Sequence, residues 1–156
     1  MNALTPPLSV AFDAVKPRRF VTVDPYASEA QTTALLRRGA EYRIHRINAS
    51  DMITTDEAAL LSGTSRVTIN AWIKSGRCIG VAHSRGGIKI PKWQFEPSVF
   101  HVLQAVSEAL GSTDGWTVLS FLETPHVALA GLAPRIALEQ GTTRQRILEL
   151  AAAEGQ

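Results

Sequence analysis

The sequence contains few of the residues from which metal and redox sites are built. Its single cysteine, Cys78, cannot form an internal disulfide or a thiolate zinc site, and we interpret it as a small, partly buried residue in a strand. The histidines are scattered, with no pair at the spacing of metal ligands: His45, His83, His101 and His126. We therefore expect no metal ion and no other cofactor.

Motifs of common enzyme classes are absent as well. No nucleophile elbow occurs, residues 131–135 do not match a phosphate-binding loop, and residues 85–87 are too few to form one. The order of residues does not exclude a serine–histidine–aspartate triad, because its members meet only in space. We expect no catalytic residue and no enzymatic activity.

Long apolar runs are also missing. No stretch approaches the roughly 20 residues that span a bilayer, and the N-terminus lacks the basic-then-apolar pattern of a secretion signal. The expectation is a cytoplasmic protein that does not enter a membrane. A hydrophobic content of 45% and a charged content of 19% are ordinary for a globular protein.

Charge is unevenly distributed, although the formal net charge is only +2. Residues 1–95 carry thirteen Lys and Arg against seven Asp and Glu, a net +6, whereas residues 96–156 carry three against seven, a net −4. A basic front part suits a polyanion such as DNA, because each cation placed on a phosphate releases condensed counterions. The acidic remainder suits a protein partner.

The first 50 residues divide into two segments. Residues 1–27 contain four prolines and no sustained hydrophobic period, which predicts a flexible N-terminal arm. The cations of this arm are either solvated or in contact with phosphate: Lys16, Arg18 and Arg19. Residues 28–50 carry an amphipathic helix over 28–48 that Ser28 can cap and Gly39 can interrupt. This helix either packs on the next domain or pairs with a second copy.

The most informative pattern lies in residues 51–95. Thr54 and Glu57 have the spacing of a capping box, which predicts a helix from this point. Three apolar side chains of that helix are expected in the core: Ala58, Leu60 and Leu61. Gly63 then provides a turn residue that tolerates positive φ, and Ser65 caps a second helix that runs to about residue 74.

The second helix, which Gly76 ends, has two different faces. Ile69, Trp72 and Ile73 recur at helical spacing and are expected in the core. We expect the other side and the start of the helix to contact DNA: Ser65, Arg66, Val67, Thr68, Asn70 and Lys74. Arginine pairs with guanine and asparagine with adenine, whereas the two hydroxyls suit the backbone, with packing of the turn as the alternative for Thr68.

A basic hairpin is predicted after this helix. Residues 79–83 and 88–90 have the composition of short strands, and Arg85, Gly86 and Gly87 suit the tip between them. Cations on such a tip usually lie against phosphates or in the minor groove. We expect contacts from Arg85 and Lys89, with His83 as a further candidate. Trp93 and Phe95 are then expected to fold back as core aromatics.

Residues 54–91 resemble the excisionase and MerR-like winged helix–turn–helix family. The likeness covers about a quarter of the chain and departs from the family at the small Ala71. The matching residues are Thr54-Thr55-Asp56-Glu57-Ala58-Ala59, Leu61, Gly63, Ser65-Arg66, Thr68-Ile69, Trp72-Ile73, Ser75-Gly76-Arg77 and Ile90-Pro91. The resemblance implies a fold that places the second helix in the major groove of DNA.

Residues 96–156 predict a compact helical domain. Pro97 suits the first turn of a helix, Asp114 can cap a second one, and Thr142 with Gln145 has the spacing that starts a last helix. Several positions resemble the Xre/MbcA/ParS toxin-binding domain: Trp116, Phe121-Leu122, Pro125, Leu129, Gly131, Pro134, Ala137-Leu138 and Gly141. The family's Gly-Gly is Ala130-Gly131 here, and Ala133 replaces a residue that is often polar.

In that family this small helical unit ends antitoxins that pair with RES-type toxins, which consume NAD. The resemblance implies that the tail from Arg144 onward reaches toward the toxin, and three cations are candidates to face its acidic rim: Arg135, Arg144 and Arg146. A solvated last helix is the alternative. Such antitoxins usually carry a different helix–turn–helix type at the front.

Together these patterns predict a mainly α protein, with a winged helix–turn–helix and small β-hairpin followed by a small helical domain. The expected segments are an arm (1–27), an amphipathic helix (28–50), a DNA-binding domain (51–95) and a toxin-binding domain (96–156). The predicted function is that of a homodimeric antitoxin that binds its double-stranded DNA operator, represses its operon and neutralises a RES-like toxin. The alternatives are a phage-type excisionase or transcriptional regulator whose last domain only dimerises or recruits a partner, and a helical adaptor that never meets DNA.

Overall fold

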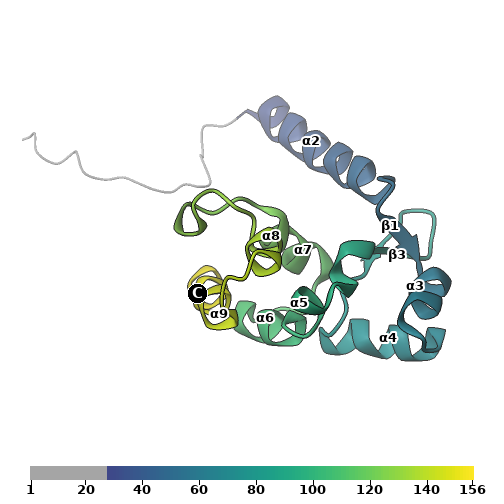
Figure 1. Cartoon of the computed structure of the whole chain (residues 1–156). Helices are drawn as coiled ribbons and strands as arrows, with labels where there is room; N and C mark the ends of the chain where they lie inside the picture. Colours follow the sequence, from purple (N-terminus) through teal and green to yellow (C-terminus); the bar gives the residue numbers. More distant parts are fainter. Residues whose placement is uncertain (1–27) are drawn as a thin grey trace, which may run out of the picture. The chain divides into compact units, whose positions relative to one another are not determined.

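The computed structural model describes residues 28–156 (Figure 1). These residues are mainly helical, with one small three-stranded antiparallel sheet. The chain divides into two units, Met1–Ile44 and His45–Gln156. The arm predicted for residues 1–27, together with Lys16, Arg18 and Arg19, lies outside the described residues.

Helix α2 (Glu29–Ile47) is continuous. It begins at Ser28 as predicted: the Ser28 hydroxyl accepts a hydrogen bond from the Gln31 N–H, and the Gln31 side chain accepts one from the Ser28 N–H. Gly39 does not interrupt the helix, because one glycine costs a helix only about 1 kcal/mol. Its large apolar side chains before residue 45 are exposed: Leu35, Leu36, Tyr42 and Ile44.

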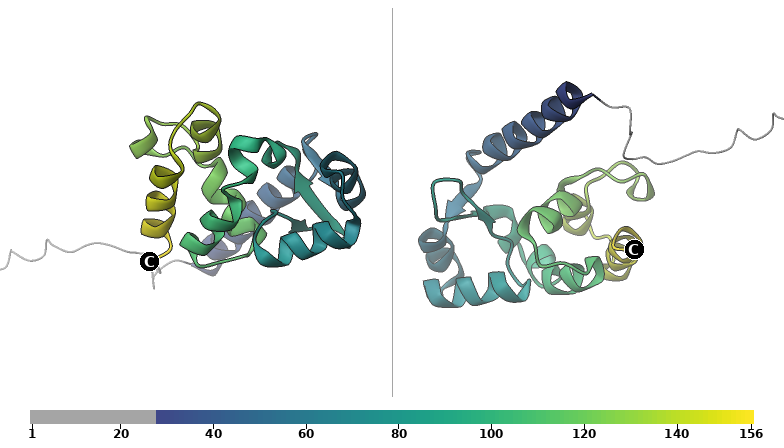
Figure 2. Two further views of the ribbon diagram at one scale, coloured as in Figure 1. Left: turned by 60° about the horizontal axis from the view of Figure 1, so that its bottom comes forward. Right: turned by 180° about the vertical axis from the view of Figure 1, so that it is seen from behind.

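The unit His45–Gln156 follows from the last turn of α2. Its elements are β1 (Met52–Thr54), α3 (Thr55–Ser62), α4 (Arg66–Ser75), β2 (Val81–Ala82), β3 (Ile88–Pro91), η1 (Lys92–Phe95), α5 (Pro97–Phe100), α6 (Leu103–Leu110), α7 (Gly115–Glu123), η2 (Val127–Leu129), α8 (Pro134–Glu139) and α9 (Arg144–Glu154). Figure 2 shows α9 beside α6, and these two helices are in close contact.

The sheet has the order β1–β3–β2, with both pairs antiparallel. The predicted hairpin is present, but its first strand is limited to Val81 and Ala82, which pair with Lys89 and Ile88. Strand β1, in which Ile53 pairs with Ile90, was not predicted from the sequence. Three residues that pass directly into a capped helix are too few to show a strand period.

Four of the five predicted side-chain caps are observed, at Ser28, Thr54, Ser65 and Asp114. Thr54 and Glu57 form the complete capping box of α3, and Asp114 caps α7 through the Thr117 N–H. The predicted start of the last helix is wrong by one residue, because the Thr143 hydroxyl rather than Thr142 accepts from the Arg146 N–H. Adjacent threonines offer two equivalent caps, and the spacing alone does not choose between them.

Two clusters of buried side chains form the interior of His45–Gln156. The smaller lies between α3, α4 and the sheet and includes Ile69 and Ile90, neither of which exposes any surface. The larger fills the region of α5–α9 and also includes Met52, Ile79 and Val81. Side chains from before and after residue 96 thus share the larger core. The domain boundary predicted after residue 95 stays a prediction.

Two of the three side chains predicted in the core of α3 are exposed. Leu60 exposes 84% of its surface and Leu61 50%, whereas Ala58 exposes none. Helix α3 instead turns Thr55, Ala58 and Ala59 inward, at positions i, i+3 and i+4. Small side chains let α3 approach α4 closely, and this preference for small residues was not apparent from hydrophobicity.

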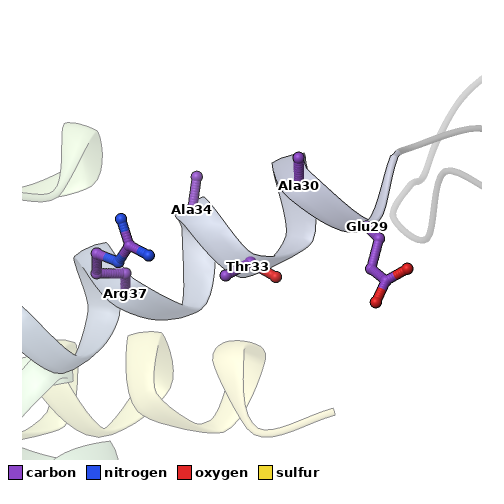
Figure 3. A pocket seen from close by; sticks show the side chains of 5 residues that line it. All are labelled: Glu29, Ala30, Thr33, Ala34 and Arg37. Carbon is purple, nitrogen blue, oxygen red and sulfur yellow. The ribbon is translucent and has the colours of Figure 1, made fainter.

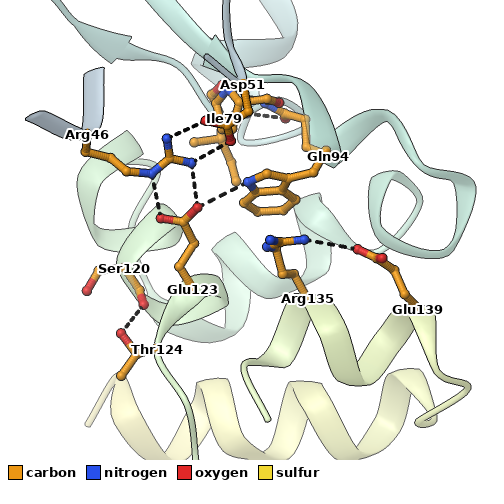
Figure 4. A network of polar contacts seen from close by, with 11 residues as sticks. Arg46, Asp51, Ile79, Gln94, Ser120, Glu123, Thr124, Arg135 and Glu139 are labelled. Carbon is orange, nitrogen blue, oxygen red and sulfur yellow. Dashed lines mark hydrogen bonds and ion pairs between the residues drawn. The ribbon is translucent and has the colours of Figure 1, made fainter. Parts of the chain in front are cut away.

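Polar side chains connect distant segments of this unit (Figure 4). The Arg46 guanidinium donates to both carboxylate oxygens of Asp51, at 2.8 and 2.9 Å, and to both of Glu123, at 3.0 and 2.6 Å. These carboxylates raise the pKa of Arg46, with the Glu123 hydrogen bond as the largest cause. Glu123 also accepts from the Trp93 indole at 3.1 Å. One ion-pair network therefore joins α2, η1 and α7.

A buried amide supports the segment between α4 and the hairpin. The fully buried Gln94 side chain accepts from the Ile79 N–H at 2.7 Å and donates to the carbonyls of Ile79 and Pro91. Ile79 lies outside the strands and has no strand partner for its backbone. The Gln94 amide therefore satisfies both the N–H and the carbonyl of Ile79. Gln94 thereby fixes the position of the chain that leads into β2.

Candidate nucleic-acid interface

Helices α3 and α4 pack against each other and are joined by a tight turn. Gly63 ends α3 with φ of 66°, a left-handed conformation that glycine adopts without a Cβ penalty. Ser65 then caps α4 by accepting from the Thr68 N–H at 3.1 Å. With Ile69 fully buried behind it, α4 is held in one rotation about its own axis.

That rotation leaves one side of α4 free. Arg66, Asn70 and Lys74 follow one another at intervals of four residues and are all exposed. Val67 lies beside this row and exposes 78% of its surface. On the other side, the Trp72 ring packs against Phe100 with centroids 5.5 Å apart. The inward and outward faces predicted for this helix are therefore observed.

The two predicted hydroxyl contacts are already engaged within the protein. The hydroxyls of Ser65 and Thr68 lie 3.0 Å apart and form a hydrogen bond with each other. Thr68 is half-buried, in agreement with the alternative that it packs the turn. A hydroxyl has one donor and two acceptor positions, so Ser65 keeps capacity for one further contact.

The loop of the hairpin is ordered by its own backbone. The His83 N–H donates to the Gly87 carbonyl, and the Gly86 N–H donates to the His83 carbonyl. The His83 ring accepts from the Arg85 N–H through Nδ1 at 3.1 Å. Arg85 is exposed on this loop, and Lys89 is half-buried on β3. His83 thus supports the loop conformation in addition to lining the surface described next.

An open hollow of about 370 Å³ lies between the starts of α3 and α4 and the hairpin. Its lining residues are Thr54, Thr55, Asp56, Arg66, His83, Arg85, Gly86, Gly87, Ile88 and Lys89. Three predicted contacts, Arg66, Arg85 and Lys89, are thereby brought to one surface although 23 positions separate the first from the last. Asn70, Lys74 and Val67 do not line this hollow and belong to the side of α4.

One acidic side chain also reaches this surface, although the sequence predicted no role for it there: Asp56 lines the hollow. The Asp56 carboxylate lies 3.6 Å from the Arg66 guanidinium, and both side chains are largely exposed. Asp56 therefore balances part of the positive charge of Arg66. The pKa of the neighbouring Glu57 is lowered, chiefly by the hydrogen bond from the Thr54 backbone N–H. Asp56 and Arg66 are ten positions apart, at the starts of two successive helices, and the sequence carries no local signal for such a pair.

The three arginines predicted to face a partner have different surroundings. The Arg135 guanidinium lies 4.9 Å from the centre of the Trp93 ring and forms an ion pair with Glu139 at 3.3 Å (Figure 4). Arg146 donates to the Ala128 carbonyl at 3.3 Å, and Arg144 is the exposed first residue of α9. Arg135 is thus engaged within the fold, whereas Arg144 and Arg146 lie at the start of the last helix.

Other features of the described residues offer less chemistry. A hollow along α2 is lined by residues of that helix alone: Glu29, Ala30, Thr33, Ala34 and Arg37 (Figure 3). Cys78 is buried outside the strands, contrary to the strand prediction, and burial raises the pKa of its thiol to about 12. Within residues 28–156, no three His, Cys, Asp or Glu side chains come together as a metal site would need.

Comparisons with family models, curated proteins and solved structures found no match for this chain. None of the helices described in residues 28–156 combines the length and apolar character needed to cross a membrane.

Proposed function

We propose that α3, α4 and the hairpin form a winged helix–turn–helix that binds double-stranded DNA. The observation that carries the proposal is the outward row of Arg66, Asn70 and Lys74 on a helix whose opposite side is fixed by Ile69. A B-DNA major groove admits a single α-helix, and arginine and asparagine read guanine and adenine there. In this proposal Val67, which is exposed beside this row, contacts a thymine methyl group.

The hollow beside this row supports a phosphate contact. Arg85 and Lys89 line it, so one backbone phosphate can meet two cations of the hairpin, while Arg66, which also lines the hollow, reaches the base edges in this proposal. The Ser65 cap adds the partial positive charge of the α4 N-terminus. In this proposal the hollow fixes the register on DNA, and the row on α4 reads the sequence.

We further propose that residues 96–156 bind a RES-like toxin and that the whole chain acts as an autoregulating antitoxin. The support is local. Phe121-Leu122 and Ala137-Leu138, which resemble positions of the toxin-binding family, are buried in the larger core. Where the family has Gly-Gly, Ala130 and Gly131 both adopt positive φ, at 58° and 84°. Glycine is the residue that such a backbone favours.

A homodimer completes the proposal. Four large apolar side chains of α2 are exposed, and a helix normally buries such residues against a partner. Two linked copies would bind two operator half-sites, and a two-fold operator would match them. Cytoplasmic localisation and the lack of enzymatic activity follow from this function as parts of the same proposal.

DNA binding is tested by fluorescence anisotropy with a duplex of the region upstream of the chain's own gene. We expect specific binding with a strong salt dependence, because several cations would displace counterions. The variant Arg85→Ala should weaken binding of all duplexes and lower the salt slope by about one, as expected for one lost phosphate contact. Arg144→Ala serves as the matched control, since it removes an exposed arginine outside the surface. Failure of the wild-type protein to prefer its upstream region over a scrambled duplex would refute operator binding.

Toxin neutralisation is tested with the product of the reading frame that neighbours the gene. Co-expression should rescue growth from that protein, and the purified pair should form a stable complex. The excisionase or regulator alternative predicts DNA binding without rescue or a complex. The adaptor alternative predicts no specific DNA binding at all.

A further inference from the structure

The loop between α7 and α8 is unusual for a surface segment. From Val127 to Ala133 it contains no polar side chain, although surface loops are normally rich in them. Val127 exposes 94% of its surface, the largest value among the exposed large hydrophobic residues described. Ala128, Ala130 and Gly131 are exposed as well. Single exposed apolar residues are common, but an exposed run of them marks a contact surface.

This loop is nevertheless held in one conformation. The His126 N–H donates to the Leu132 carbonyl, and the His126 carbonyl accepts from Leu129 and Gly131. The His126 ring accepts from the Ala128 N–H through Nδ1 at 3.1 Å. Leu129 is buried and anchors the centre of the loop in the core. A rigid loop loses little conformational entropy when a partner binds it.

The backbone of the loop also carries a conformational cost. Ala130 has φ of 58°, and it is the one non-glycine residue with positive φ in the described part of the chain. A left-handed alanine costs roughly 1–2 kcal/mol. The hydrogen bonds of the loop maintain this strained conformation, and strained backbone of this kind gathers at binding sites.

Positive charge lies beside the apolar run. Arg146 reaches back from α9 and donates to the Ala128 carbonyl at 3.3 Å. Arg144 and Arg146 occupy the first turn of α9, which contains no acidic residue. Cations are unfavourable at a helix N-terminus, where the macrodipole favours anions. An acidic group of a partner would offset the unfavourable interaction of these arginines with the helix dipole. The surface therefore suits a partner whose apolar pocket has an acidic rim.

We propose that residues 126–133, flanked by Arg144 and Arg146, are the docking surface for the toxin, with Val127 inserted into an apolar pocket. This inference rests on the proposed antitoxin function and gives it a location. Arg135 is not part of the surface, because Trp93 and Glu139 already hold its guanidinium. A symmetric contact with a second copy is disfavoured, since it would bring the arginines of both copies to the same rim.

The test measures binding between the full chain and the purified product of the neighbouring reading frame by isothermal titration calorimetry. Val127→Asp should weaken the affinity at least about tenfold, because the valine that is exposed in the free chain, and that the partner's pocket would bury on binding, is replaced by an unpaired charge. Leu60→Asp is the matched control, an exposed aliphatic residue at 84% on α3, and should bind as wild type. Arg144→Glu with Arg146→Glu should weaken binding and make its salt dependence shallower.

The outcomes separate the two levels of the proposal. If the wild-type chain does not bind the neighbouring product, the antitoxin function fails and the docking surface with it. If the wild type binds but Val127→Asp binds equally well, the antitoxin function stands and the docking surface is wrong. Equal losses for Val127→Asp and Leu60→Asp would also overturn the location. Because both side chains are exposed, each variant is expected to keep wild-type thermal stability.

Discussion

The interior and the α4 surface use polar side chains in opposite ways. Arg46 and Gln94 are buried or nearly so, and neighbouring groups occupy their hydrogen-bonding atoms on several sides. Arg66 and Asn70 are exposed, and the only ion pair of Arg66 is the loose one to Asp56 among the described residues. The difference teaches that positive charge in this chain does not by itself locate a binding surface. Cations that are paired within the interior stabilise the fold, whereas exposed and loosely paired cations are available to a ligand.

The largest expected effect concerns Gln94, one of the two interior polar side chains in this comparison. Gln94→Ala should lower the free energy of unfolding by about 3 kcal/mol, because it leaves the buried Ile79 N–H without a partner and the Ile79 carbonyl with only the weak contact of the Cys78 thiol at 3.9 Å. Chemical denaturation followed by circular dichroism measures the loss. Gln104→Ala on α6 is the control, since Gln104 is exposed, and it should stay within about 0.5 kcal/mol of wild type. Similar losses for both variants would show that Gln94 does not hold the segment.

The ion-pair network should give the next largest effect. Glu123→Gln should cost about 2 kcal/mol, because the nearly buried Arg46 would lose one of its two charged partners. Glu139→Gln breaks the more exposed pair with Arg135 and should cost less than about 0.5 kcal/mol. Thermal unfolding of both variants checks the difference. A Glu139 variant as unstable as the Glu123 variant would contradict the assignment of Glu123 as the centre of the network.

How far the sequence predicted these features depended on the distance between the residues involved. The caps at Thr54, Ser65 and Asp114 act within three residues, and the sequence predicted all three. Arg46 and Glu123 are 77 positions apart, and nothing local indicates that pair. The hydrophobic pattern placed Ile69 correctly but not Leu60, because it does not report how closely two helices approach.

The candidate site was predictable to a similar degree. The row on α4 followed from helical periodicity around Ile69, which depends on a single element. The sequence did not indicate that Asp56 would lie beside Arg66, or that Arg135 would be taken up by Trp93, because both contacts depend on the tertiary fold. DNA and toxin binding stay predictions that rest on these placements.

A smaller effect concerns the backbone of the loop before α8. Ala130→Gly should raise the free energy of unfolding by about 1 kcal/mol, because glycine adopts the left-handed conformation without the Cβ penalty. Ala128→Gly is the control at an exposed neighbour in η2, and it should be neutral or slightly destabilising. Differential scanning calorimetry resolves the sign. Destabilisation by Ala130→Gly would contradict a strained backbone at this position.

The smallest expected effect concerns the exposed surface around Arg66 and its affinity for DNA. Asp56→Asn should raise the affinity for the upstream duplex by about threefold, because it removes an anion beside Arg66 and the incoming phosphate. Glu108→Gln on α6 removes an equal charge away from the surface and should change the affinity little. Anisotropy titrations at one fixed salt concentration give both values. Weaker binding by Asp56→Asn would show that the carboxylate orients Arg66 instead of competing with DNA.

The most direct test of base reading by α4 is the ratio of affinities for the upstream duplex and a scrambled duplex in the variant Arg66→Ala with Asn70→Ala. Both side chains are exposed, so the variant should fold as wild type. We expect its specific binding to fall at least about a hundredfold, as for two lost base contacts, while binding to the scrambled duplex falls far less. A double variant that discriminates between the two duplexes as well as wild type would show that α4 does not read the sequence.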